Sequence, residues 1–151
     1  MGDNMKKNSE NEEKKEYLRS YRNCIKAVKR IEGYLQELEI NEICPSLSMN
    51  GMPAAVTYNN RDLSDYVVKK DKLISDMLRA RYQRITTYKE VIGQIELLND
   101  EDEKNVLMYR YIKGMQWEDV AAKLNVEWAQ IHRIHARALQ HFSIPDKDDI
   151  E

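Results

Sequence analysis

Hydrophobic residues recur at intervals of three and four along the first part of the chain, which is the spacing of an apolar stripe on one face of an α-helix. This pattern predicts a first helix at about residues 13–38. Its stripe comprises Leu18, Tyr21, Ile25, Val28, Ile31, Leu35 and Leu38. Residues 1–12 are polar and charged, lack such a repeat, and are expected to be disordered.

A second helix is predicted at residues 62–98, with Asp62 as its N-cap. At 1.5 Å per residue it would be roughly 55 Å long. A helix of that length must bury its stripe against the first helix, another chain, or both. Residues 39–61, which contain Pro45, Gly51 and Pro53, form the expected linker. Residues 13–98 are therefore predicted to form a helical hairpin or coiled coil.

Three shorter helices are predicted in the C-terminal part, at residues 102–113, 117–124 and 128–142. The acidic residues at 100–103 suit a helix start, and Gly114 suits a helix end. Four residues are expected to close the core of this part, namely Tyr109, Ile112, Leu139 and Phe142. Residues 99–145 are expected to form one domain, followed by an acidic tail at 146–151. The whole fold is predicted to be all-α.

Residues 117–136 have the pattern of a helix-turn-helix. Apolar residues stand where the two helices must touch, at Val120, Ala121, Leu124, Val126, Ile131 and Ile134. Ala121 is small where the helices would cross most closely, and Asn125 tolerates the left-handed backbone usual in the turn. The alternative is an ordinary helical hairpin in a bundle, which does not require a small residue and a turn residue at these positions.

In a helix-turn-helix the outer face of the second helix enters the major groove of DNA. The candidate DNA-binding residues are Glu127, Trp128, Ala129, His132, Arg133, Ala136 and Arg137, with Lys123 on the preceding helix. Arg133 is expected to contact a base edge or a phosphate and Arg137 a phosphate; the alternative is that both are solvated charges. Trp128 would stack on a sugar or a thymine methyl group, or else cover the turn.

The charge distribution and the absence of recognisable catalytic or metal-binding groups limit the classes of function that are expected. The formal charge is −2, but residues 104–142 hold six Lys and Arg against three Asp and Glu, an excess of three positive charges. Because that field is modest, a second copy is expected to be needed for firm DNA binding, and a homodimer is predicted. The spacing of His132 and His135 alone is weak support for a metal site. No cofactor, metal or catalytic grouping is expected, and the chain is not expected to be an enzyme.

The composition fits a soluble, helix-rich protein, with 33% charged residues, five Gly and three Pro. No apolar run is long enough to span a membrane, and the N-terminal residues do not form a signal peptide. The two cysteines, Cys24 and Cys44, form no CxxC pair, so a reducing cytoplasm is the expected location.

Residues 102–142 resemble the fourth region of sigma-70-type RNA polymerase sigma factors, which contacts the promoter −35 element. The resemblance is carried by Glu103, the LMYRY run at 107–111, Gly114, the DVA run at 119–121 and the AL pair at 138–139. Together with the DLSDY sequence at 62–66, this is similar to small sigma-like regulators of phages and prophages of Gram-positive bacteria. The resemblance implies a transcription regulator that binds double-stranded DNA, with RNA polymerase as a second candidate partner. Gln116 and Glu127 depart from the family, which usually has Ser or Thr as the N-cap at these positions.

Two other functions remain open from the sequence. Small terminase subunits of phages also join a helix-turn-helix to an oligomerising helical region, and a ring of many subunits would favour that assembly role. The second is an adaptor that binds RNA polymerase without contacting DNA; polymerase binding that survives Arg133→Ala would support it.

Overall fold

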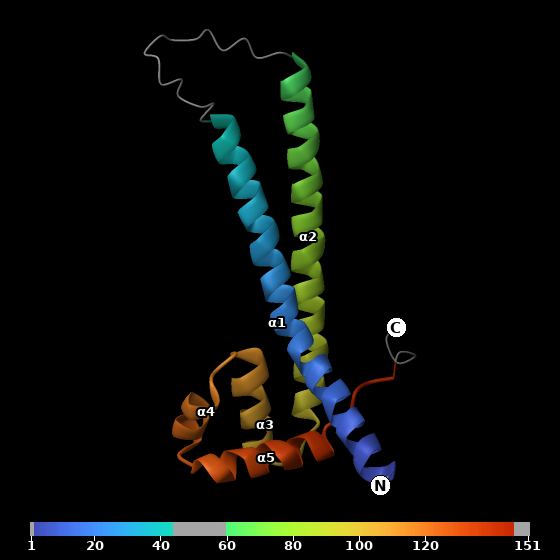
Figure 1. Ribbon diagram of the computed structural model, residues 1–151, viewed down its shortest axis with the longest axis vertical. Coiled ribbons are helices and arrows are strands. Elements are labelled where there is room, and N and C mark those ends of the chain that lie inside the picture. The colour runs from blue at the N-terminus through green and yellow to red at the C-terminus, as the bar shows by residue number, and fades with distance from the viewer. Residues whose placement is uncertain (1, 44–59, 147–151) are drawn as a thin grey trace. The chain divides into compact units, whose positions relative to one another are not determined.

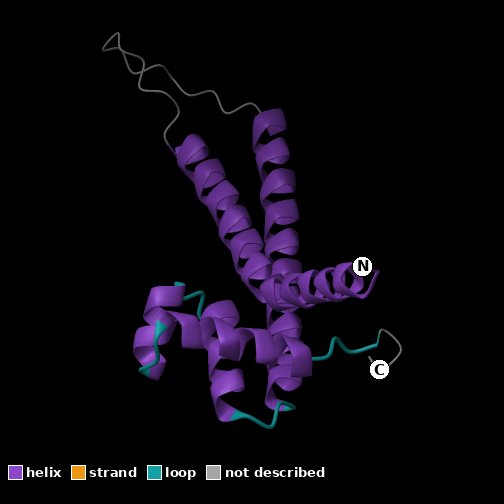
Figure 2. Ribbon diagram, turned by 60° about the horizontal axis from the view of Figure 1, so that its bottom comes forward, coloured by secondary structure: helices purple, strands orange, loops and turns teal. Residues whose placement is uncertain are grey.

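The computed structural model describes residues 2–43 and 60–146, and this part of the chain is all-helical, without strands, as predicted (Figure 1; Figure 2). The elements are α1 (Gly2–Ile43), α2 (Asn60–Glu96), α3 (Glu101–Leu107), a π-helix η1 (Met108–Ile112), α4 (Trp117–Leu124) and α5 (Trp128–His141). Most of the predicted linker at 39–61 and of the predicted tail at 146–151 lies outside the described residues. The two described ends of the linker, residues 39–43 and 60–61, are not a linker but belong to α1 and α2, because neither end contains the Pro or Gly residues that interrupt a helix. Within the described residues, no helix is both long and apolar enough to cross a membrane.

Helix α1 begins at Gly2, so residues 2–12, which were expected to be disordered, are helical instead. Their side chains explain the difference, because acidic and basic residues stand three and four positions apart. Lys14 Nζ lies 2.9 Å from a Glu10 carboxylate oxygen, and Lys15 Nζ lies 2.7 Å from one of Glu12. Such pairs stabilise a helix without contributing to an apolar stripe, which is why hydrophobic periodicity alone missed this segment.

The other helix boundaries lie close to the predicted ones, with one internal difference. Helix α2 begins at Asn60 rather than at Asp62, α4 has the predicted bounds, and α5 ends one residue early. The predicted helix at 102–113 is divided into α3 and η1, where the Lys113 backbone N–H donates to the Met108 carbonyl. This wider turn allows the neighbouring residues Tyr111 and Ile112 both to be buried.

The chain divides into two compact units. We call Met1–Cys24 together with Arg84–Glu151 the major unit, and Ile25–Gln83 the minor unit. This division differs from the predicted domain boundary between residues 98 and 99. The cause is that Leu18 of α1 and Val91 and Ile95 of α2 are fully buried in the same hydrophobic cluster as the C-terminal helices.

The major unit contains two hydrophobic clusters. The first comprises Leu18, Val91, Ile95, Leu98, Leu107, Tyr111, Ile112, Ala138, Leu139 and Phe142. The second comprises Val106, Val120, Ala121, Ile131 and Ile134. Helix α5 contributes to both clusters, because Ile131 and Ile134 face α4 while Ala138 and Leu139 lie one to two turns further along. The predicted closing residues Ile112, Leu139 and Phe142 are buried, and Tyr109 packs against the second cluster.

In the minor unit, residues of α1 and α2 are joined by two ion pairs. Arg81 Nη2 lies 2.9 Å from Glu32 Oε1, and Lys70 Nζ lies 3.3 Å from Glu39 Oε1. As the residue number rises along α1 it falls along α2, so these two stretches run antiparallel. Among the described residues of this unit, Val28 is the one buried hydrophobic residue.

Candidate nucleic-acid interface

The α4 and α5 helices pack through the residues that the sequence pattern indicated. Val120 and Ala121 of α4 and Ile131 and Ile134 of α5 are buried in one cluster, against which Leu124 and Val126 pack. Asn125 ends α4 with φ 54° and ψ 49°, in the left-handed region, as predicted. The expected contacts and the expected turn conformation are therefore both confirmed.

The opposite face of α5 is open to solvent. Among the candidate DNA-binding residues, those with exposed side chains are Lys123, Glu127, Trp128, Ala129, Arg133, Ala136 and Arg137, while His132 is half-buried. Ala129, Arg133 and Ala136 share one side of the helix, where small residues flank a single long cation. The helix thus has one buried face and one accessible face, and none of the described helices of the major unit lies over the accessible one (Figure 1).

Neither α4 nor α5 has a side-chain N-cap. Gln116 and Glu127 both have extended backbones immediately before their helices, and neither side chain accepts a hydrogen bond from the first turn. Neither residue therefore replaces the Ser or Thr cap that is usual at these positions in the family that the sequence resembles.

Aromatic rings form a continuous group at the start of α5. The His132 ring lies between two indoles, with its centroid 5.0 Å from that of Trp117 and 4.7 Å from that of Trp128. Trp128 packs edge-on against His132 yet remains 52% exposed. The indole of Trp128 is therefore held in place by the protein and still accessible to a ligand.

His135 is buried beneath this aromatic group. Its Nε2 lies 2.9 Å from the Tyr111 hydroxyl oxygen, and its ring also packs against the edge of Trp117. Burial, reinforced by the positive charges of Lys15, Arg110 and Arg19 and by His132, lowers the pKa of His135 to about 4. Burial also raises the pKa of Tyr111 to about 12. Both side chains are therefore uncharged at neutral pH and act as packing groups.

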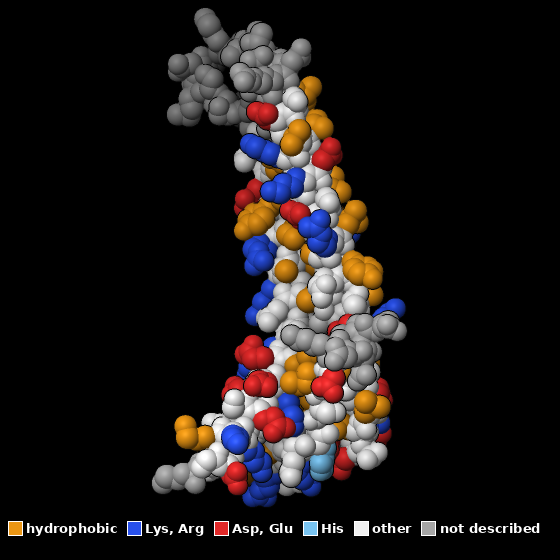
Figure 3. All heavy atoms as spheres, turned by 90° about the vertical axis from the view of Figure 1, so that its right-hand side faces the viewer, with side chains coloured by type: hydrophobic (Ala, Val, Ile, Leu, Met, Phe, Trp, Pro, Cys, Tyr) orange, Lys and Arg blue, Asp and Glu red, His pale blue; other side chains and the backbone are white. Residues whose placement is uncertain are grey.

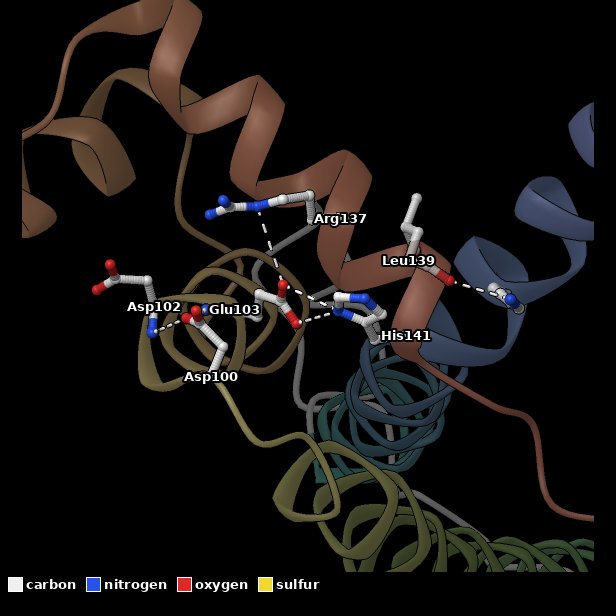
Figure 4. A network of polar contacts seen from close by, with 7 residues as sticks. Asp100, Asp102, Glu103, Arg137, Leu139 and His141 are labelled. Carbon is white, nitrogen blue, oxygen red and sulfur yellow. Dashed lines mark hydrogen bonds and ion pairs between the residues drawn. The ribbon is translucent and has the colours of Figure 1, made fainter.

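Arg137 lies next to a buried carboxylate (Figure 4). Its Nε is 3.9 Å from Glu103 Oε1, and both oxygens of Glu103 accept from His141 Nδ1 at 2.9–3.0 Å. Glu103 is only 2% exposed, whereas the Arg137 side chain is 53% exposed. The predicted phosphate contact by Arg137 must therefore compete with an internal partner, whereas Arg133 forms no ion pair with the described residues.

Helix α1 contacts the C-terminal end of α5. Lys14 is 8% exposed, and its ammonium group donates a 3.0 Å hydrogen bond to the Leu139 carbonyl oxygen (Figure 4). A cation at this position satisfies a carbonyl of the last turn and interacts favourably with the helix dipole.

Arg110 of η1 and Lys113 of the following turn both contact groups within the protein. Arg110 Nη1 donates to the Met115 carbonyl at 2.9 Å, and its guanidinium carbon lies 4.8 Å from the Trp117 ring centroid. Lys113 Nζ lies 5.4 Å from the Tyr109 ring centroid. Arg110 thus fixes the turn that leads into α4.

Two features favour Gly114 in that turn. Its φ is +68°, the left-handed conformation expected of a glycine that ends a helix. In addition, a Cβ at this position would lie 2.5 Å from Cζ of Arg22, so the guanidinium of α1 packs directly over the glycine.

We expect Gly114→Ala to lower the free energy of unfolding by about 1–2 kcal/mol, mainly because of the left-handed backbone. Urea denaturation of the full chain measures the change. The same substitution is also measured in an Arg22→Ala background. If a clash with the guanidinium adds to the cost, Gly114→Ala lowers the free energy of unfolding less in that background than in the parent. A Gly114→Ala variant as stable as the parent would contradict the turn geometry.

Several of these contacts have no local sequence signal. Glu103 and His141 are 38 residues apart, Tyr111 and His135 are 24 apart, and Lys14 and Leu139 are 125 apart. The sequence pattern located the α4–α5 pair because its contacts are local. In contrast, the burial of Glu103 depends on how α3 packs against α5.

In the described part of the chain, no group of three or more His, Cys, Asp and Glu side chains could hold a metal ion. Comparisons with protein-family profiles, with curated proteins and with solved structures find no match to this chain.

Proposed function

We propose that this protein is a sequence-specific transcription regulator that binds double-stranded DNA through a helix-turn-helix formed by α4 and α5. Helix α5 would lie in the major groove. The observation that carries the proposal is the two-faced character of α5. One face is buried against α4, and the other presents Ala129, Arg133 and Ala136 to solvent.

The dimensions of α5 support this role. Its 14 residues form a rod roughly 21 Å long, and the major groove, about 12 Å wide, admits an α-helix. Small residues beside Arg133 would allow the helix backbone to approach the base edges, while the arginine could donate two hydrogen bonds to guanine. Trp128, held by His132, would supply an apolar contact to a thymine methyl group at the helix start.

The remaining charges favour a modest affinity for each copy. Lys123 and Arg133 are exposed cations, but Glu127 is an exposed carboxylate that phosphates would repel. Glu127 is compatible with DNA where it accepts from the amino group of cytosine. Two copies joined through the long helices, here proposed to form a helical hairpin in each chain, would compensate for weak single-module binding.

We expect Arg133→Ala to weaken binding to the preferred duplex by at least about fivefold, the lower end of the effect of losing one bidentate base contact. The duplex would first be selected from a random library with the full-length protein. Fluorescence anisotropy at several salt concentrations then gives the affinity and its salt dependence.

Arg79→Ala is the matched control, since it removes the same charge from a highly exposed side chain of α2. It should leave the affinity unchanged. The proposal fails if the parent protein shows no salt-sensitive binding to any selected duplex below about 10 μM at low salt. It also fails if Arg133→Ala and Arg79→Ala have equal effects.

A further inference from the structure

Helix α2 carries a second apolar stripe that the described part of the chain covers only in part. The stripe consists of Val67, Ile74, Leu78, Ile85 and Tyr88. Val67, Leu78, Ile85 and Tyr88 are between 41% and 59% exposed, Ile74 is half-buried, and the Tyr88 ring also packs against Tyr21 of α1, with ring centroids 5.1 Å apart. Figure 3 shows hydrophobic side chains at intervals along the surface of the long helices. Exposed apolar side chains in a continuous row, unlike scattered ones, indicate an interaction surface.

The spacing of this stripe is that of a coiled-coil seam. When Asp71 and Arg81 are included, positions 67, 71, 74, 78, 81, 85 and 88 alternate steps of four and three without a break. They span three heptads, or about 30 Å of helix. The stripe therefore fits another helix of the same repeat, but two of its seven positions are occupied by charges of opposite sign.

The neighbouring face of α2 in the minor unit is already occupied. Residues at positions 66, 70, 73, 77 and 80 are half-buried, and Lys70 in this row forms the ion pair with Glu39 of α1. This inner row includes a lysine and an alanine, so it is no more apolar than the exposed stripe. The pairing with α1 therefore does not account for the hydrophobic residues on the other face.

The charges of Asp71 and Arg81 determine the orientation in which a second α2 helix can pack on the stripe. If a second α2 runs antiparallel, with the twofold axis at position 76, position 71 of each chain lies opposite position 81 of the other. The same register places Val67 opposite Ile85 and Ile74 opposite Leu78. In a parallel pair, Asp71 would instead face Asp71 and Arg81 would face Arg81, which is unfavourable inside a seam.

We propose that this protein dimerises through an antiparallel coiled coil of two α2 helices, centred on position 76, with Asp71 of each copy paired with Arg81 of the other. Arg81 already lies 2.9 Å from Glu32 of its own chain, so in the dimer its guanidinium would lie between two carboxylates. The interface is isologous, as expected for a closed dimer. The proposal does not depend on DNA binding.

Charge exchange tests the pairing. Sedimentation equilibrium of the full-length protein is expected to give twice the chain mass of 17.9 kDa. Asp71→Arg and Arg81→Asp should each raise the dimer dissociation constant at least about tenfold, because each places like charges opposite one another. The double variant restores opposite charges across the seam and should recover most of the lost affinity. Recovery is incomplete because Arg81→Asp also removes the ion pair with Glu32.

The alternatives give a different result. A parallel dimer already has like charges opposite one another at both positions, so neither single change raises its dissociation constant. A dimer formed by another surface is insensitive to either single change. Either result, or a monomeric parent protein at about 50 μM, within the micromolar range of specific association, overturns the proposal. Circular dichroism shows whether each variant remains helical, which is expected because both side chains are exposed.

Cross-linking tests the orientation separately, in a background with Cys24→Ser and Cys44→Ser. In the proposed dimer the two copies of position 75 lie next to the twofold axis, whereas those of position 67 are about 27 Å apart along the helices. A short bismaleimide should therefore link Ser75→Cys into a covalent dimer and leave Val67→Cys unlinked. Efficient linking of Val67→Cys would overturn the antiparallel arrangement.

Discussion

Replacing Phe142 by alanine is expected to lower the free energy of unfolding by about 3–5 kcal/mol, the usual cost of removing a buried aromatic side chain. Phe142 follows directly after α5 and is 2% exposed. Its ring centroid lies 5.9 Å from that of Tyr17 on α1, within the cluster that also contains Leu18 and Val91. The substitution therefore removes a contact that joins both long helices to the C-terminal helices.

A loss of this size would be evident in thermal unfolding, as a decrease in Tm of roughly 6–20 °C for a chain of this length. Ile144→Ala is the matched control, since Ile144 is two residues further on and 38% exposed. It should change the free energy of unfolding by less than about 1 kcal/mol. Equal effects of the two substitutions would mean that Phe142 is not part of the core.

The C-terminal helices were predictable because their determinants are local. Helices α4 and α5 are short, and their buried residues fall within one run of the sequence around Asn125. Asn125 adopts the left-handed conformation that its residue type tolerates, and Gly114 does so as well. In such a segment, residue type and spacing determine both the turn and the buried face.

The division into units was not predictable, since it depends on contacts between distant segments. Leu18, Val91 and Phe142 each fit an amphipathic helix pattern, but the pattern does not identify the partners that each residue contacts. For the same reason the candidate site was only partly predicted. The sequence indicated the exposed face of α5, whereas the pairing of Arg137 with Glu103 required the packing of α3 against α5.

Helix α2 illustrates a different limit. Its hydrophobic residues form two stripes, and the sequence alone does not indicate which of them faces α1. The structure resolves this, because positions 66, 73 and 77 are half-buried while Val67 and Leu78 are exposed. The opposite charges of Asp71 and Arg81 can be interpreted only after the exposed stripe has been identified.

The second large effect is a loss of folding stability at acidic pH. We expect His135 to make the protein less stable as the pH falls from about 6.5 to about 4, with a loss of about 3 kcal/mol over this range. The sign follows from the lowered pKa of His135, about 4 in the folded chain. Below pH 6.5 the unfolded chain binds a proton at this histidine and the folded chain does not, so protonation favours unfolding. Above pH 6.5 neither state is protonated and this contribution to the pH dependence is absent.

Urea denaturation between pH 7.5 and 4 measures the loss, and His135→Gln is the control. Glutamine can still accept a hydrogen bond from Tyr111 but does not titrate, so the variant should retain only the pH dependence caused by carboxylates. The difference between the two profiles isolates the histidine, because those carboxylates are common to both proteins. A direct NMR titration of the imidazole gives the pKa of His135 in the folded chain. A value near 6.5, or parallel stability profiles for parent and variant, would show that the ring is protonated without unfolding. The packing of His135 between Tyr111 and Trp117 would then have to be more open than the structure indicates.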